Sequence, residues 1–197
     1  MEDIVQAFAQ FVEALRQANV KYVVGGSFAS GAWGHPRATN DLDIAIRLES
    51  DRVGALIELL GDEFSVDTVA VRHCLESADE YRSFQIVHLP SMLTIDAFIP
   101  PHSPFSKSVF SRAHTVRVFI GVEANCMSAE DIVIQKLRWF VLGNRVSDKQ
   151  WNDIVQVLEV QGPRLDQDYL RQWAEYFGLQ DLLDQALKQA LQDQQTQ

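Results

Sequence analysis

The sequence predicts an α+β fold, in which a mixed sheet with flanking helices over residues 1–127 is followed by a C-terminal helical bundle over residues 128–197. Two observations indicate this division. Before residue 128, short runs with a period of two, which is typical of strands, alternate with segments of helical spacing. After it, helical spacing continues to the end. A length of 197 residues suits one α/β domain with a helical second part.

The elements of the first part are predicted from periodicity and from breaks in it. Apolar spacing and short β-branched runs predict helices and strands in this order: helix 2–19, strand 21–24, helix 28–33, strand 41–47 and helix 51–60. Residues 64–82 show no clear pattern. Strand-like runs follow at 83–89, 92–99, 115–120 and 122–126, and the proline-rich segment 100–104 is expected to be a loop. Pro90-Ser91 lies between two of these runs, which predicts a hairpin.

The helical part begins with a capping box. Ser128-Ala-Glu-Asp131 has a Ser three residues before an acid, and Ser147-Asp-Lys-Gln150, with Gln in place of the acid, is a second capping box before the next helix. Four helices are expected, at 129–142, 148–160, 166–177 and 180–193. Gly162-Pro163 is expected to end the second helix.

Charge and composition exclude several classes of protein. The formal net charge is −10 and no block of Lys or Arg is present, which argues against a general nucleic-acid binder. No apolar run is long enough to span a membrane. The two cysteines are too few for a disulfide framework, so we expect buried thiols and a cytoplasmic protein.

Two acids on one predicted strand are the strongest candidates for a functional site. Asp41 and Asp43 are two residues apart, so both carboxylates point to the same face, with Cα atoms roughly 6.5–7 Å apart. A divalent cation relieves their repulsion, because Mg²⁺ binds through one or two carboxylates together with substrate phosphates. The alternative is a pair of solvated acids on an edge strand.

Asp96 lies in a run that otherwise indicates a buried strand, Leu93 to Ile99. A buried acid is costly unless it pairs with a cation or binds a metal. Should its strand lie beside that of Asp41 and Asp43, three carboxylates would meet, as two-metal phosphoryl transfer requires. Pairing with an Arg is the alternative.

Two further features are typical of phosphate binding. Gly25-Gly26-Ser27 follows a strand and opens a helix, where backbone N–H groups can approach phosphate oxygens. Lys136 lies on an apolar helix face and either extends its amine to solvent or points into a cleft toward an anion. A simple tight turn remains the alternative for the glycines.

Together these residues resemble the nucleotidyltransferase (polymerase β-like) superfamily. The resemblance rests on Gly25-Gly26-Ser27, then Arg37-Ala-Thr-Asn-Asp-Leu-Asp43, then a third acid on a later strand. The Arg-x-Thr-x-Asp form and the helical part are similar to AbiEii-type toxin nucleotidyltransferases and their uncharacterised bacterial relatives. In that group a Lys and an Asp from successive helices are expected at the site, and Lys136 and Asp153 occupy the matching positions.

The resemblance implies metal-dependent transfer of a nucleoside monophosphate from an NTP to an acceptor hydroxyl. Asp41, Asp43 and Asp96 would bind Mg²⁺ or Mn²⁺, and Asp96 would also act as general base. The acceptor would be RNA such as tRNA, a protein, or a small molecule. A role in a toxin–antitoxin system, with an antitoxin partner, is also implied.

For nucleotide binding, the resemblance implies two groups of residues. Gly25, Gly26 and Ser27 would bind the phosphates of the NTP. Lys136, Arg37 and Asp153 would complete the nucleotide site. The alternative function is a catalytically silent module of the same fold that binds nucleotide or protein.

Overall fold

The computed structural model describes residues 2–80 and 82–194, which pack as two units. Unit 1 comprises residues 1–25 and 38–126, and unit 2 comprises residues 26–37 and 127–197. The short segment 26–37 leaves the first unit and returns to it, so unit 2 is not continuous in the sequence. The division at residue 127 that the sequence predicts stays a prediction.

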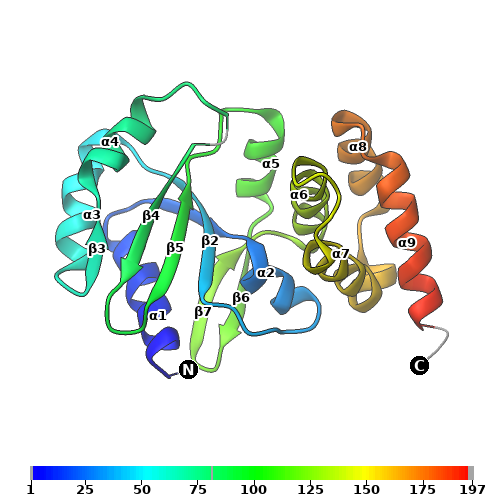
Figure 1. Ribbon diagram of the computed structural model, residues 1–197, viewed down its shortest axis with the longest axis horizontal. Coiled ribbons are helices and arrows are strands. Elements are labelled where there is room, and N and C mark those ends of the chain that lie inside the picture. Colours follow the sequence, from blue (N-terminus) through cyan, green and yellow to red (C-terminus); the bar gives the residue numbers. More distant parts are fainter. Residues whose placement is uncertain (1, 81, 195–197) are drawn as a thin grey trace. The chain divides into compact units, whose positions relative to one another are not determined.

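Unit 1 is built on a mixed sheet of seven strands in its described residues, in the order β3-β4-β5-β2-β1-β7-β6 (Figure 1). The strands are β1 (Lys21–Val24), β2 (Asp41–Arg47), β3 (Phe64–Val66), β4 (Ser83–His88), β5 (Leu93–Phe98), β6 (His114–Phe119) and β7 (Val122–Cys126). β2 runs parallel to β5 and antiparallel to β1. β4–β5 form the antiparallel hairpin that the sequence predicts around Pro90-Ser91, and β6–β7 form a second one.

The long helix α1 (Glu2–Gln17) reaches both edges of this sheet with its apolar side chains. The Phe8 ring meets Phe119 of edge strand β6 at 5.5 Å, and the Phe11 ring meets Phe64 of edge strand β3 at 6.1 Å. In β2, the alternate residues Leu42, Ile44 and Ile46 are completely buried. The acids of β2 therefore lie on the opposite face of the strand.

Three shorter helices complete unit 1: α3 (Val53–Leu60), α4 (Thr68–Glu76) and α5 (Pro104–Ser111), with a 3₁₀ turn at Ser50–Arg52 before α3. Two of them, α4 and α5, lie where no helix is predicted from the sequence. The Asp67 carboxylate accepts hydrogen bonds from the N–H groups of Val69 and Ala70 and caps α4. Ser103 caps α5, and Pro104 occupies its first turn, where a missing N–H costs nothing.

Unit 2 is all helical in its described residues (Figure 1). It contains α2 (Gly26–Trp33), α6 (Ala129–Leu142), α7 (Asp148–Gln161), α8 (Gln167–Phe177) and α9 (Gln180–Gln194), with a 3₁₀ turn at Gly162–Arg164. Both predicted caps form, because Ser128 accepts from the Asp131 N–H and Ser147 from the Gln150 N–H. α7 packs against α2, α6 and α9.

None of the helices in the described ranges combines the length and apolar content that crossing a membrane requires.

Candidate active site

The three predicted acids of unit 1 lie on neighbouring strands. β2 and β5 are parallel, and their register places Asp43 directly beside Asp96 and Asp41 beside Thr94. Neighbouring residues in register project to the same face, with strands about 4.8 Å apart. Asp41 is two residues from Asp43 and shares that face. The fold thus brings together carboxylates that are more than fifty residues apart in the sequence.

These carboxylates are accessible to solvent. Asp41 is exposed, and Asp43 and Asp96 are half-buried. Gln85, in register with Asp96 on β4, donates a hydrogen bond from its Nε2 to Asp96 Oδ1 at 3.0 Å. Like charges side by side on adjacent strands are destabilising, so Asp43 and Asp96 are placed at some cost to the fold.

The donor set fits a metal that is completed by its substrate. In residues 2–80 and 82–194, no three His, Cys, Asp or Glu side chains are grouped closely enough to hold a metal ion by themselves. Mg²⁺ does not need such a group, because it binds through one or two carboxylates and takes its other ligands from water and phosphate. Asp43 and Asp96 supply two carboxylates on one face, with Asp41 next along the strand.

The turn after β1 is held against the strand of the acids. The Gly25 N–H donates to the Asp43 carbonyl oxygen at 2.9 Å. Gly26 then adopts a φ of +53°, in the region that favours glycine, and opens α2 with Ser27 as its second residue. The positive φ explains why position 26 is a glycine. The helix α2 begins two residues earlier than the sequence predicts.

In unit 2, four of the predicted site residues, Ser27, Arg37, Lys136 and Asp153, form one hydrogen-bonded network. Lys136 Nζ lies 2.8 Å from Asp153 Oδ2, and Arg37 Nε lies 3.1 Å from Asp153 Oδ1. A second nitrogen of Arg37 donates to both Asp153 Oδ2, at 3.3 Å, and Ser27 Oγ. Lys136 also donates to Gln150 Oε1 at 3.1 Å. The network joins α2, the loop after it, α6 and α7.

This network is buried at one end and open at the other. The side chains of Lys136 and Asp153 are 4% and 3% exposed, whereas that of Arg37 is 36% exposed. Lys136 therefore neither extends to solvent nor points to an empty cleft: the anion that it meets is Asp153. In the described part of the chain, Arg37 Nη1 has no hydrogen-bond partner, so it can receive a ligand.

The charge of Asp153 depends on its two basic partners. Burial alone raises the pKa of a carboxyl group, but the hydrogen bonds and charges of Arg37 and Lys136 outweigh burial, and the pKa of Asp153 is lowered from its ordinary value. The carboxylate is thus ionised at neutral pH. A buried charge of this kind is tolerated because it is paired twice.

Close packing of α2 on α7 positions Ser27 and Arg37 within unit 2. A Cβ atom on Gly34 would lie 3.2 Å from the Val157 nitrogen, so the helix backbones approach too closely for a larger residue. Trp33 Nε1 donates to the Met127 carbonyl oxygen at 2.7 Å, and Gln161 Nε2 donates to the Trp33 carbonyl oxygen. Both contacts hold Trp33 at the end of α2, four residues before Arg37.

Sequence reasoning missed two members of these groups, Gln85 and Gln150. Gln85 is an exposed residue of a predicted strand, and only the pairing of β4 with β5 reveals its contact with Asp96. Gln150 was used only as the end of a capping box. Its position three residues before Asp153 on a helix places both side chains on one face, which could have indicated a shared role.

Solved structures with a similar fold identify the architecture. The solution structure of the antibiotic-resistance factor ANT(2'')-Ia matches with a TM-score of 0.57 at 13% identity, over 90% of this chain and 94% of that one. The crystal structure of ANT(2'')-Ia with adenylyl-2''-tobramycin matches with a TM-score of 0.59 at 16% identity, over 90% and 99%. The crystal structure of JHP933 from Helicobacter pylori matches with a TM-score of 0.51 at 15% identity, over 92% of this chain and 75% of that one.

No family model and no curated protein matches the sequence. At these identities, the structural likeness shows the fold. The sequence prediction of fold class is confirmed: the chain has the mixed α+β fold of nucleotidyltransferases, a seven-stranded mixed sheet in its described residues, with C-terminal helices.

Proposed function

We propose that this protein is a metal-dependent nucleotidyltransferase, which moves a nucleoside monophosphate from an NTP to an acceptor hydroxyl. The observation that carries the proposal is the register of β2 and β5, which places Asp43 beside Asp96 on one accessible face with Asp41 next to them. Carboxylates gathered on one accessible face suit a cation that arrives with its substrate.

The carboxylates have two roles in this proposal: they bind the metal ion, and one of them accepts a proton from the acceptor. Asp41, Asp43 and Asp96 would hold Mg²⁺ or Mn²⁺, which would neutralise charge that develops on the phosphates. Asp96 accepts the proton of the acceptor hydroxyl, and Gln85 fixes its orientation through the bond to Oδ1. The acceptor oxygen forms a bond to the α-phosphorus while the bond to the leaving oxygen breaks, and pyrophosphate is released.

The unit 2 residues serve the triphosphate. Ser27, with its hydroxyl, and Arg37, with its free Nη1, supply donors to phosphate oxygens, as does the backbone at Gly25 and Gly26. We assign Lys136 and Asp153 a positioning role, because both are buried and bonded to each other. Their pair holds the Arg37 guanidinium in one orientation, which lowers the entropic cost of gripping the phosphate.

For the acceptor, the proposal begins with small polycations. The ANT(2'')-Ia structure contains an adenylylated aminoglycoside, and the present chain carries a net charge of −10. An acidic protein attracts cationic substrates and repels RNA. RNA, tRNA and protein acceptors rank lower on this ground. The AbiEii-type role and its antitoxin partner stay predictions of the sequence resemblance.

The test is calorimetric titration of ATP, CTP, GTP and UTP with Mg²⁺ into wild-type protein and the Asp41→Asn/Asp43→Asn variant. An Asp51→Asn/Asp62→Asn variant is the matched control, because it removes the same charge from exposed positions outside the site. We expect Mg²⁺-dependent binding that only the first variant loses. Equal binding by all three proteins, or none by folded wild type, would contradict the proposal.

Activity separates the transferase from a silent module. The nucleotides that bind are incubated with Mg²⁺ and an aminoglycoside panel, and released pyrophosphate is measured. Release that depends on both the acceptor and Asp43 supports transfer. Tight, metal-dependent binding without release across small-molecule, RNA and protein acceptors favours the silent nucleotide-binding module.

A further inference from the structure

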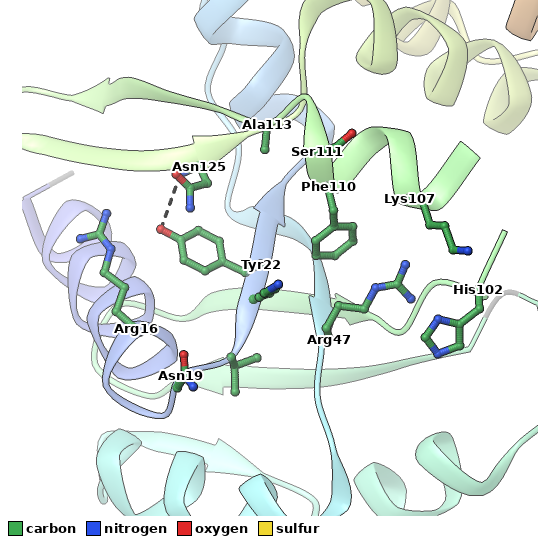
Figure 2. Close-up of a pocket in the computed structure, with 12 residues that line it drawn as sticks. Arg16, Asn19, Tyr22, Arg47, His102, Lys107, Phe110, Ser111, Ala113 and Asn125 are labelled. Carbon is green, nitrogen blue, oxygen red and sulfur yellow. Dashed lines mark hydrogen bonds between the residues drawn. The ribbon is translucent and has the colours of Figure 1, made fainter. Parts of the chain in front are cut away.

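A second site lies in unit 1, at the other end of β1 and β2 from the carboxylates. A pocket of about 710 Å³ opens between the end of α1, the start of β1, β7 and α5 (Figure 2). Lys21 and Arg47 line it and face each other in the first pair of the β1–β2 register. Arg47 is four residues beyond Asp43 on β2, which is roughly 13 Å along the strand. Arg47 and Asp43 project to the same face of β2, but the pocket lies toward the other end of the strand, and none of the three carboxylates lines it.

The pocket exists because two strands diverge. β1 and β7 are neighbours in the sheet, yet in the register that the structure describes they pair at one position, Val24 with Cys126. Away from this pair, the strands are linked by the Asn125 N–H, which donates to the Tyr22 hydroxyl oxygen at 3.5 Å (Figure 2). Arg16 of α1 and Lys107, Phe110 and Ser111 of α5 also line the pocket.

The lining is basic although the protein is acidic. Arg16, Lys21, Arg47 and Lys107 line the pocket together with His102, and no Asp or Glu is among its described lining residues. The whole chain has 17 Lys and Arg and a net charge of −10. Four of these cations around one cavity make a local positive field, and a cavity with low-dielectric walls concentrates such a field.

Arg47 forms the inner wall of the pocket. Its guanidinium donates to the Pro100 carbonyl oxygen at 2.8 Å and to Ser106 Oγ, and lies over the Phe110 ring at 4.7 Å. These partners fix its position but are neutral. Within the described ranges, no carboxylate forms an ion pair with Arg47, Lys21 or Lys107. Burial, and then the charge of Arg82, lowers the pKa of Arg47.

The size of the pocket and the chemistry of its lining limit the class of ligand. Pockets of about 300–1,000 Å³ take small molecules and cofactors, and this one falls within that range. Phe110 and Tyr22 place aromatic rings in the lining beside the cations (Figure 2). Arg is well suited to phosphate through paired N–H donors, and Lys adds mobile charges at the mouth.

We propose that this pocket binds a phosphorylated small molecule of nucleotide size, with its phosphate held by Arg47, Lys21 and Lys107 and its ring against Phe110. The ligand is separate from the transferred NTP, because none of the three carboxylates lines the pocket. A nucleic-acid strand fits less well, since the cations surround a cavity and do not form an extended stripe.

The experiment is a titration of the full-length ¹⁵N-labelled chain, followed by ¹H–¹⁵N correlation spectra. The probes are inorganic pyrophosphate and AMP, both in EDTA, so that no metal loads the carboxylates. The variant is Lys21→Gln/Lys107→Gln, which removes two exposed lysines that have no role in the catalytic proposal. Lys149→Gln/Lys188→Gln, which removes two exposed lysines of unit 2, is the control of equal charge.

We expect AMP to shift the amide signals of residues 19–22, 47 and 107–113, with wild-type affinity in the control. The Lys21→Gln/Lys107→Gln variant should bind at least about tenfold more weakly, because each lost contact is a charged hydrogen bond. Shifts confined to residues 25–30, or equal affinity in both variants, would overturn the proposal. It would also be overturned if a single-stranded oligonucleotide shifted these amides while AMP and pyrophosphate did not.

Discussion

The acids of unit 1 and the charged network of unit 2 differ in how their charges are arranged. Asp41, Asp43 and Asp96 gather charge of one sign on an accessible face, and one neutral side chain, Gln85, steadies them. Around Asp153, charges of both signs are paired at hydrogen-bond distance, and Lys136 and Asp153 are buried. In the proposed function the acids of unit 1 take a cation with the substrate, whereas Asp153 already has its two cationic partners within the fold.

This difference separates function from stability. Removing an acid from the open group relieves repulsion and should leave folding intact while it abolishes chemistry. Removing an acid from the closed network leaves buried cations without a partner, and folding should fail first. Each prediction below tests one side of this contrast.

The largest effect is expected for Asp43→Asn. Loss of a metal-binding carboxylate beside Asp96 should lower turnover by about 10³-fold or more, since metal-dependent charge neutralisation supplies several kcal/mol. The free energy of unfolding should change by less than about 1 kcal/mol, because like charges on adjacent strands are being separated. Pyrophosphate release and urea denaturation measure the two quantities. A large loss of stability with turnover retained would mean that Asp43 supports the fold and not the reaction.

Asp153→Ala should show the converse. It leaves Lys136 and Arg37 without their shared carboxylate, and breaking a buried pair costs about 3–5 kcal/mol. Urea denaturation of the whole chain measures this loss. A Lys136→Met/Asp153→Leu variant is the control, since replacing both partners by apolar residues should recover much of the stability. If the single change costs less than about 1 kcal/mol, the fold does not depend on Asp153 to pair Lys136 and Arg37.

The same carboxyl group predicts a pH dependence. Its pKa is lowered in the folded protein, so the stability that it contributes is fully present above its ordinary value of about 4. That stability is lost as the pH falls from about 4 through the depressed folded pKa. The difference in unfolding free energy between wild type and Asp153→Asn should therefore be constant at pH 5–7 and shrink below pH 4. A difference that stays constant to pH 2.5 would contradict the lowered pKa.

The two regions also differ in how far the sequence predicted them. Asp41 and Asp43 are two residues apart on a strand, and local alternation is enough to place them on one face. That Asp96 lies beside Asp43 depends on the pairing of β2 with β5, a non-local contact that no periodicity encodes. The superfamily resemblance supplied this expectation.

For unit 2, the limit was different. The helix of Lys136 was predicted with its correct ends from Ser128 and the apolar spacing. The partner of Lys136 was not predicted. Whether its amine meets solvent, a ligand or a second helix depends on how α6 packs against α7. The missed helix α5 is a local failure: Ser103 and Pro104 are a start signal, but the prolines before it indicated only loop.

Gly34→Ala tests how tightly the closed region is packed. The new methyl group would meet the backbone of α7 at 3.2 Å from the Val157 nitrogen and 3.3 Å from the Gln156 carbonyl carbon. Neither atom is a flexible side chain, so a helix must shift, and overpacking costs typically about 1–3 kcal/mol. Thermal denaturation should show the loss, with Gly54→Ala as the control because its Cβ meets nothing within 4 Å. Equal behaviour of the two variants would mean that α2 is not held closely against α7.

The smallest effect concerns Gln85, the neutral support of the open group. Gln85→Leu removes the hydrogen bond to Asp96 Oδ1 without adding charge. As a residue that orients a catalytic base, it should lower kcat by about tenfold and leave the KM for the NTP unchanged, because it touches no phosphate in the proposed mechanism. Gln85→Glu should lower kcat further, because it places a further carboxylate directly beside Asp96. If Gln85→Leu keeps the wild-type kcat, Gln85 does not orient the base. The open group would then consist of the three acids alone.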